Sequence, residues 1–100
     1  MTVKLIMNWD ITPQREREYF EFVIREFIPG VQRLGFDLSD AWATAYGRQP
    51  QIMVTAITSD KEKAEEIIRS ENWEKLTDSL MDFVENYSIK LVEAGRGFQF

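Results

Sequence analysis

The 100-residue chain contains no cysteine and no histidine. Without cysteine it can form no disulfide, thiolate metal site or thiol nucleophile, which is typical of cytosolic proteins. Without histidine it lacks the usual general base at neutral pH and the usual ligand of zinc and haem iron. Acid–base chemistry would then come from Asp, Glu, Lys or Tyr, and we expect neither a metal site nor a cofactor.

Long apolar runs and basic clusters are also missing from the sequence. No stretch approaches the roughly 18 apolar residues of a membrane span, and the chain does not open with a basic and then apolar secretion signal. The net charge of −5 repels phosphate backbones, and no glycine-rich nucleotide-binding motif occurs. The sequence therefore predicts a cytoplasmic protein that binds neither membranes nor nucleic acid.

The size and composition match one globular domain over residues 1–100, with 44% hydrophobic and 29% charged residues. Residues 3–11 alternate between apolar and more polar side chains, which predicts a first strand. Residues 38–46 and the apolar run 52–57 predict a second and a third strand. The connection between them is rich in turn formers, so we expect an antiparallel hairpin.

A first helix is predicted to follow the first strand. Thr12 has the character of an N-cap, and Pro13 suits the first helical position. Pro29–Gly30 should bend the helix, which is expected to end near Gly35. Its apolar residues recur at three- and four-residue spacing: Phe20, Val23, Ile24, Phe27, Ile28, Val31 and Leu34. The residues expected to pack onto one sheet face are Phe20, Ile24 and Phe27 from this stripe and Leu76, Leu80 and Val84 from the second helical region.

A capping-box pattern at Ser59 predicts the start of a second helical region. Its apolar stripe loses phase across residues 70–72 and then resumes, so we expect a short helix that bends into a longer one. The longer helix is predicted to run to about Val92, although the alternating run 89–91 leaves a strand open there. Residues 98–100 then predict a short last strand.

These elements give an α+β domain of ferredoxin-like βαββαβ type, with an antiparallel sheet and two helices on one face. The third strand is apolar on both faces, and two helices can cover only one of them. An exposed apolar face of this kind usually marks an interface. Because most homo-oligomers are two-fold dimers, we expect a homodimer in which the sheets pack face to face.

The whole pattern resembles the dimeric α/β-barrel superfamily, which includes antibiotic-biosynthesis-type and haem-degrading monooxygenases, muconolactone isomerases and NIPSNAP-like proteins. The resemblance rests on the element order, on Asn8 in the first strand, on residues 70–76 entering the long helix, and on the closing residues 98–100. In the haem-degrading branch an Asn and a Trp similar in placement to Asn8 and Trp73 line the pocket, and a His ligates the iron. That His has no counterpart here, so haem degradation is not expected.

The resemblance implies a pocket between sheet and helices for a small apolar or aromatic molecule. Relatives that act without metal or flavin oxidise electron-rich aromatic substrates, and their polar and aromatic side chains orient the substrate. Asn8, Trp73, Trp42 and Tyr46 are the candidate substrate-binding residues on this basis. Each also has a purely structural interpretation, because Trp73 continues an apolar helix stripe, Asn8 lies on the more polar side of its strand, and amphipathic rings are enriched at interfaces.

Two functions therefore stay open from the sequence. The first is a cofactor-independent monooxygenase or isomerase that acts on a small apolar or aromatic molecule. The second is a non-catalytic dimeric module that binds a ligand or a protein. A closed dimer that retains an enclosed cavity touching Asn8 or Trp73 would favour the first function, and a filled cavity would favour the second.

Overall fold

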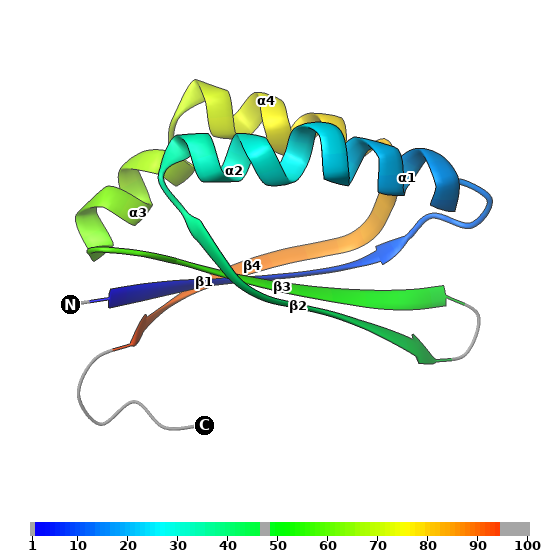
Figure 1. The fold of residues 1–100 in the computed structure, drawn as a ribbon, viewed down its shortest axis with the longest axis horizontal. Helices are drawn as coiled ribbons and strands as arrows, with labels where there is room; N and C mark the ends of the chain where they lie inside the picture. The colour runs from blue at the N-terminus through cyan, green and yellow to red at the C-terminus, as the bar shows by residue number, and fades with distance from the viewer. Residues whose placement is uncertain (1, 47–48, 95–100) are drawn as a thin grey trace.

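The computed structural model describes residues 2–46 and 49–94 (Figure 1). Its elements in chain order are β1 (Thr2–Ile11), α1 (Glu16–Phe22), the π-helical turn η1 (Val23–Phe27), α2 (Ile28–Leu34), β2 (Asp37–Tyr46), β3 (Gln49–Thr58), α3 (Lys61–Ile68), α4 (Glu71–Leu80) and β4 (Val84–Ala94). The helical segments fall into two regions, so the predicted βαββαβ order is confirmed.

The sheet has the strand order β2-β3-β1-β4, and each neighbouring pair is antiparallel. The hairpin between β2 and β3 is confirmed, with Tyr46 paired to Gln49. All the labelled helices lie on the same face of the sheet (Figure 1). This arrangement confirms the predicted α+β ferredoxin-like fold, and it leaves the opposite sheet face open in the part of the chain that is described.

The core lies between the helices and the covered sheet face. β1 shows why, because every second residue along it points into this layer. These residues are no more than 1% exposed: Val3, Leu5, Met7, Trp9 and Ile11. Their neighbours on β1 lie on the open face, so the alternation predicted from the sequence is confirmed.

The first helix starts later than the sequence predicts. α1 begins at Glu16, with Arg15 at its N-cap position. The prediction that Thr12 caps a helix starting at Pro13 is therefore wrong. The backbone N–H of Arg15 donates to the Thr12 carbonyl at 3.1 Å and closes a turn, in which Gln14 adopts a φ of 70°. A right-handed helix cannot continue through that backbone angle, so it begins after the turn.

Helix α1 continues into α2 through the wider turn η1. The backbone N–H of Ile28 donates to the carbonyl of Val23, whereas an α-helix would use the carbonyl one residue later. The turn ends at Phe27, two residues before Pro29, whose ring would crowd the fourth preceding carbonyl in a regular α-helix. The predicted bend takes this form, and α2 ends at Leu34 with Gly35 as its C-cap.

The π turn also changes which side chains face the sheet. One extra residue rotates the preceding helix by about 100° relative to α2. Phe20 is consequently 50% exposed and Ile24 is 67% exposed, and Tyr19 and Phe22 are buried in their place. The prediction that Phe20 and Ile24 pack onto the sheet is therefore wrong, whereas Phe27 is buried as predicted.

The second helical region confirms the predicted bend and corrects its start. The Oγ of Ser70 accepts a hydrogen bond from the backbone N–H of Trp73 at 3.2 Å and caps α4. The cap of α3 is Asp60 and not Ser59, because the Asp60 carboxylate accepts from the backbone N–H of Lys63 at 2.7 Å. A carboxylate also complements the positive end of the helix dipole.

The last third of the chain departs most from the sequence prediction. α4 ends at Leu80, so the prediction that it runs to about Val92 is wrong. The alternative strand at residues 89–91 is part of β4, which pairs with β1. This strand satisfies the backbone groups along one edge of β1, which a helix could not do. The short strand expected at residues 98–100 lies outside the described residues.

Candidate functional site

A small apolar cavity, partly open to solvent, lies between the first helical region and the sheet. Its volume is about 210 Å³. The lining side chains are apolar or aromatic and come from both layers: Trp9, Tyr19, Phe20, Val23, Phe27, Ile28, Leu38, Ala41, Ile52 and Val54. Because none of these lining residues is charged, the cavity suits an uncharged apolar molecule. We call it the α1 cavity.

Trp9 connects the wall of the α1 cavity to three aromatic neighbours. Its ring meets Phe27 edge-on at 5.7 Å between centroids and stacks on Tyr87 at 6.2 Å. It also lies edge-on to Tyr19, and its indole Nε1 donates a hydrogen bond to the Tyr19 hydroxyl at 2.8 Å. This buried bond holds both rings in place, since neither polar atom has access to water.

Two one-residue insertions meet at Trp9. On the helix side, η1 brings Phe27 against its ring. On the sheet side, the β1–β4 register shifts between Asn8 and Asp10, so that β4 carries one extra residue opposite Trp9. Asn86 in this bulge adopts a φ of 56°, and its Nδ2 donates to Asp10 Oδ2 at 2.8 Å. Both kinds of insertion are over-represented at functional sites.

The α1 cavity offers a proton donor but no base. Burial raises the pKa of the Tyr19 hydroxyl above its usual value, and the hydrogen bond from Trp9 opposes this rise. The phenol therefore stays protonated at neutral pH. Because the lining contains no carboxylate, amine or imidazole, the cavity can bind, orient and shield a molecule but has no side chain suited to abstracting a proton.

Three of the four candidate substrate-binding residues lie on strands of the sheet, and Asn8 faces its open side. Asn8 is half-buried there and lines a hollow of about 520 Å³ together with Met53. Trp42 occupies the register position opposite Met53, and Met53 in turn pairs with Asn8. Tyr46 lies further along β2, opposite Gln49. The backbone register thus places Asn8 and Trp42 in one row across the sheet.

Trp73 lies on the other side of the sheet. It is 4% exposed on α4, and its ring centroid is 5.9 Å from that of Phe36. It is therefore a packing residue of the helix-covered core and is separated from Asn8 by the sheet itself. Neither Trp73 nor Asn8 is among the residues that line the α1 cavity.

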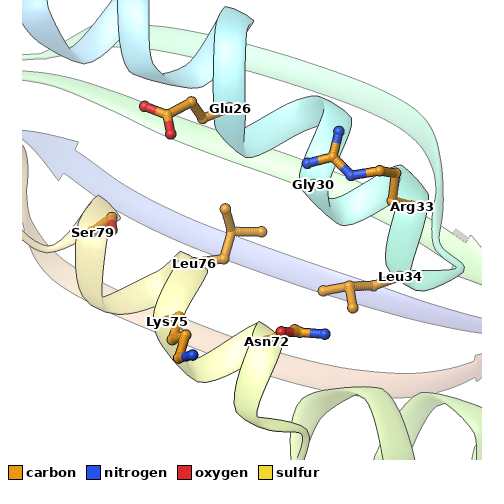
Figure 2. Close-up of a pocket in the computed structure, with 8 residues that line it drawn as sticks. All are labelled: Glu26, Gly30, Arg33, Leu34, Asn72, Lys75, Leu76 and Ser79. Atoms are coloured by element: carbon orange, nitrogen blue, oxygen red, sulfur yellow. The ribbon is translucent and has the colours of Figure 1, made fainter.

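A third hollow, of about 540 Å³, runs between α2 and α4 (Figure 2). Figure 2 shows Leu76 reaching from α4 toward α2, and a Cβ at Gly30 would lie only 2.9 Å from its Cδ2 atom. Gly30 therefore allows the two helices to approach closely. Arg33 and Lys75 line this groove, and Lys75 is paired with Glu71 at 3.5 Å. These exposed, mixed charges distinguish it from the apolar α1 cavity.

Two other kinds of site are absent from the described residues. Within residues 2–46 and 49–94, no three acidic, cysteine or histidine side chains come together as a potential metal site. None of the described helices combines the length and apolar character that a membrane crossing requires.

No protein-family model and no curated protein matches the sequence. Solved structures do match it over nearly the whole chain. A NIPSNAP domain protein from Burkholderia xenovorans superposes with a TM-score of 0.69 at 13% identity, and the match covers 100% of both chains. The chain has the fold of the NIPSNAP-domain proteins. The resemblance stated from the sequence is confirmed at the level of the fold.

Two further structures with this fold carry other names. A protein of the ethyl tert-butyl ether D family from Bacillus halodurans has a TM-score of 0.69 at 18% identity, covering 95% of this chain and 100% of that one. A protein from Nitrosomonas europaea, provisionally named an antibiotic biosynthesis monooxygenase, has a TM-score of 0.69 at 9% identity, covering 98% and 94%. Proteins with different family names therefore share this fold, and the fold alone assigns no activity to the chain.

Trp9 and Tyr19, which line the α1 cavity, are not among the candidate site residues predicted from the sequence. Trp9 was predicted to lie on the apolar side of β1, but nothing in the sequence separates it from an ordinary core residue. Tyr19 was not predicted to be buried, because a regular helix places Phe20 and not Tyr19 on the inner face. Pro29 is the one sequence signal for a π turn in this helix. A helix drawn with that turn would have placed Tyr19 on the inner face.

Proposed function

We propose that this protein binds a small apolar or aromatic molecule in the α1 cavity. The observation that carries the proposal is an apolar volume of about 210 Å³ that the native side chains leave unfilled. The exposed Phe20 and Ala41 leave this hollow partly open to solvent, and an apolar cavity of about 150 Å³ can already accommodate benzene. The α1 cavity therefore has the size for a molecule with one ring or two fused rings.

Cofactor-independent oxygenation is the reaction that this site supports best. Such a reaction uses an electron-rich aromatic substrate that reduces oxygen itself, so the protein needs only to bind, orient and exclude water. Isomerisation by proton abstraction would require a base, which the lining of the α1 cavity does not supply. The name of the Nitrosomonas europaea neighbour is consistent with the oxygenase, and a ligand-binding module without catalysis is the alternative.

Ligand binding is tested by titrating the protein with indane, a fused-ring hydrocarbon, by calorimetry. We expect saturable binding that Val23→Phe weakens at least tenfold, because the larger side chain fills the cavity. Ile68→Phe, at a half-buried position outside the cavity, serves as the matched control. No saturable binding of indane, or equal binding by both variants, would overturn the proposal.

Oxygenation is tested with a dihydroxynaphthalene under labelled oxygen gas. An oxygenase should accelerate oxygen uptake over buffer and incorporate one labelled oxygen atom into the product. The Val23→Phe variant should lose that acceleration in parallel with indane binding. Saturable indane binding without any acceleration would leave the non-catalytic ligand-binding module as the function.

We also propose that a second copy of the chain covers the open sheet face. Met53 is 38% exposed there, and Ile6, Ile57 and Val92 are half-buried on the same face. Packing two such faces would bury an obligate-type apolar interface, commonly above about 2,000 Å². The hollow at Asn8 would then lie between the two sheets.

The dimer is tested by light scattering and by melting at several protein concentrations. We expect a dimer whose melting temperature rises with concentration, because association stabilises the folded state. Met53→Glu should weaken it by burying an unpaired carboxylate, and Ile57→Glu should act alike. Met81→Glu is the matched control, since Met81 is 40% exposed but lies beyond the end of α4. A folded monomer with a dilution-independent melting temperature would contradict the dimer.

A further inference from the structure

We infer that the two copies of the chain pack with the β2 edge of each sheet over the β4 edge of the other, so that Asp40 of one copy pairs with the partner's Lys90. The inference rests on the proposed dimer, to which it adds the arrangement of the two sheets. It follows from the charges at the edges of the open face and from a hollow that lies opposite an exposed side chain.

The open face carries unpaired charges of opposite sign at its two edges. Asp37 and Asp40 are exposed on β2, the strand at one edge. Lys90 is exposed on β4, the strand at the other edge, and it lines the hollow on this face. Within the described part of the chain, no ion pair involves any of these three side chains. A partner that covers the face would therefore meet an acidic edge and a basic edge.

One row of paired residues joins Asp40 to Lys90 across the sheet. Asp40 is opposite Thr55 in the register of β2 and β3. Thr55 is in turn opposite Ile6, and Ile6 is opposite Lys90. The row spans three strand spacings, or about 14 Å, so the two charges cannot pair within one chain. They lie at the same height along the strands, at opposite edges of one face.

Two faces with nearly aligned strands can be related by a two-fold axis in two ways. With the axis along the strands, β2 of one sheet lies over β4 of the other, and each row of paired residues lies over the same row of the partner. Asp40 then faces the partner's Lys90. With the axis across the strands, β2 lies over β2, which brings the acidic edge against itself. Like charges at an interface cost free energy, so the charge pattern selects the first arrangement.

The hollow on the open face fits the same arrangement. Met53 is 38% exposed and lies opposite Asn8 in the register of β1 and β3. With the axis along the strands, β1 of one sheet lies over β3 of the other, so the partner's Met53 lies over Asn8. Because Asn8 lines the hollow of about 520 Å³, the flexible side chain of the partner's Met53 can enter it. The two methionines then supply apolar contacts between the charged edges.

Cross-linking tests the arrangement, because the native chain contains no cysteine. The variants Asp40→Cys, Lys90→Cys and Asp40→Cys/Lys90→Cys are treated with a short bismaleimide reagent, which can span the roughly 10 Å between packed sheets. The double variant should give a covalent dimer on a denaturing gel. Each single variant should stay monomeric, since identical positions lie at opposite edges of the interface.

Two results of the cross-linking would overturn the inference and leave the proposed dimer intact. One is a covalent dimer from Asp40→Cys alone, which would place β2 over β2. The other is no covalent dimer from the double variant while light scattering shows that it is dimeric. A native chain that light scattering shows to be a folded monomer would overturn the proposed dimer and this inference together.

Charge reversal tests the pair itself. The dimer would contain the pair twice, so Asp40→Lys and Lys90→Asp should each raise the dissociation constant of the dimer about tenfold. The double variant Asp40→Lys/Lys90→Asp restores opposite signs and should return the constant to within about threefold of the native value. Fluorescence-detected analytical ultracentrifugation measures these constants.

The matched control for charge reversal is Lys75→Asp, because Lys75 lies on α4 and therefore on the helix-covered side of the sheet. It should change the dissociation constant less than about twofold. A double reversal that dissociates as readily as the single reversals would overturn the pairing of Asp40 with the partner's Lys90. An equal rise for Lys75→Asp would also overturn it, because the effect would then come from net charge alone.

Discussion

Replacing Phe27 with alanine tests the π turn, because this turn places Phe27 inside and Ile24 outside. Phe27 is 1% exposed and meets both Trp9 and Phe22, at centroid distances of 5.7 and 6.2 Å. Truncation of a fully buried phenylalanine costs about 3–5 kcal/mol through lost burial and the cavity left behind. The edge-to-face contact with Trp9 places the expected loss toward the upper end of that range.

The matched variant is Ile24→Ala, three positions earlier in the same helical region. Because Ile24 is 67% exposed, its truncation should cost less than about 0.5 kcal/mol, as for most surface changes. Urea unfolding followed by circular dichroism at one fixed protein concentration measures both losses. With a slope of about 1–3 kcal/mol per M, the Phe27→Ala midpoint should fall by roughly 2 M. Equal losses for the two variants would refute the assigned helix phase and with it the π turn.

Two smaller predictions concern a helix cap and a buried phenol. Asp60→Ala should lower the unfolding free energy by about 0.5–2 kcal/mol because it removes the α3 cap. Ser59→Ala should change the unfolding free energy by less than about 0.5 kcal/mol. A larger loss for Ser59→Ala than for Asp60→Ala in urea unfolding would favour the capping box at Ser59 and contradict the Asp60 cap. Burial raises the pKa of Tyr87 to about 12, against 10.0 for an unperturbed tyrosine. The folded state then holds the Tyr87 proton to higher pH, so stability should fall as pH rises between these values, and an equally steep fall in Tyr87→Phe would contradict this.

The sequence predicts the fold well wherever an element keeps one period. β1 alternates without interruption between Val3 and Ile11, and both its position and its buried side are as expected. The β2–β3 hairpin follows from two β-rich runs and their turn formers. The local sequence pattern is sufficient to predict these strands, because the spacing of their apolar residues matches the two-residue repeat of a β-strand backbone.

The errors occur where one inserted residue breaks the period. In the first helical region the π turn moves Phe20 outward, although its spacing to Phe27 fits a regular helix stripe. In β4 the bulge brings Val84 and Tyr87 to the covered face at three-residue spacing, which imitates a helix. Periodicity alone detects neither insertion, because the π turn is associated with the single residue Pro29 and the bulge forms only where β4 pairs with β1.

The same two insertions determine the wall of the α1 cavity. Removing one residue from the bulge would shift part of β4 by one position relative to β1, and such a slip turns side chains to the opposite face of a sheet. Tyr87 would then leave its stacked contact with Trp9. A regular α-helix in place of η1 would likewise rotate Tyr19 away from the indole that donates to it. The wall of the α1 cavity therefore depends on the π turn and the β4 bulge, the two features that the periodicity of the sequence does not predict.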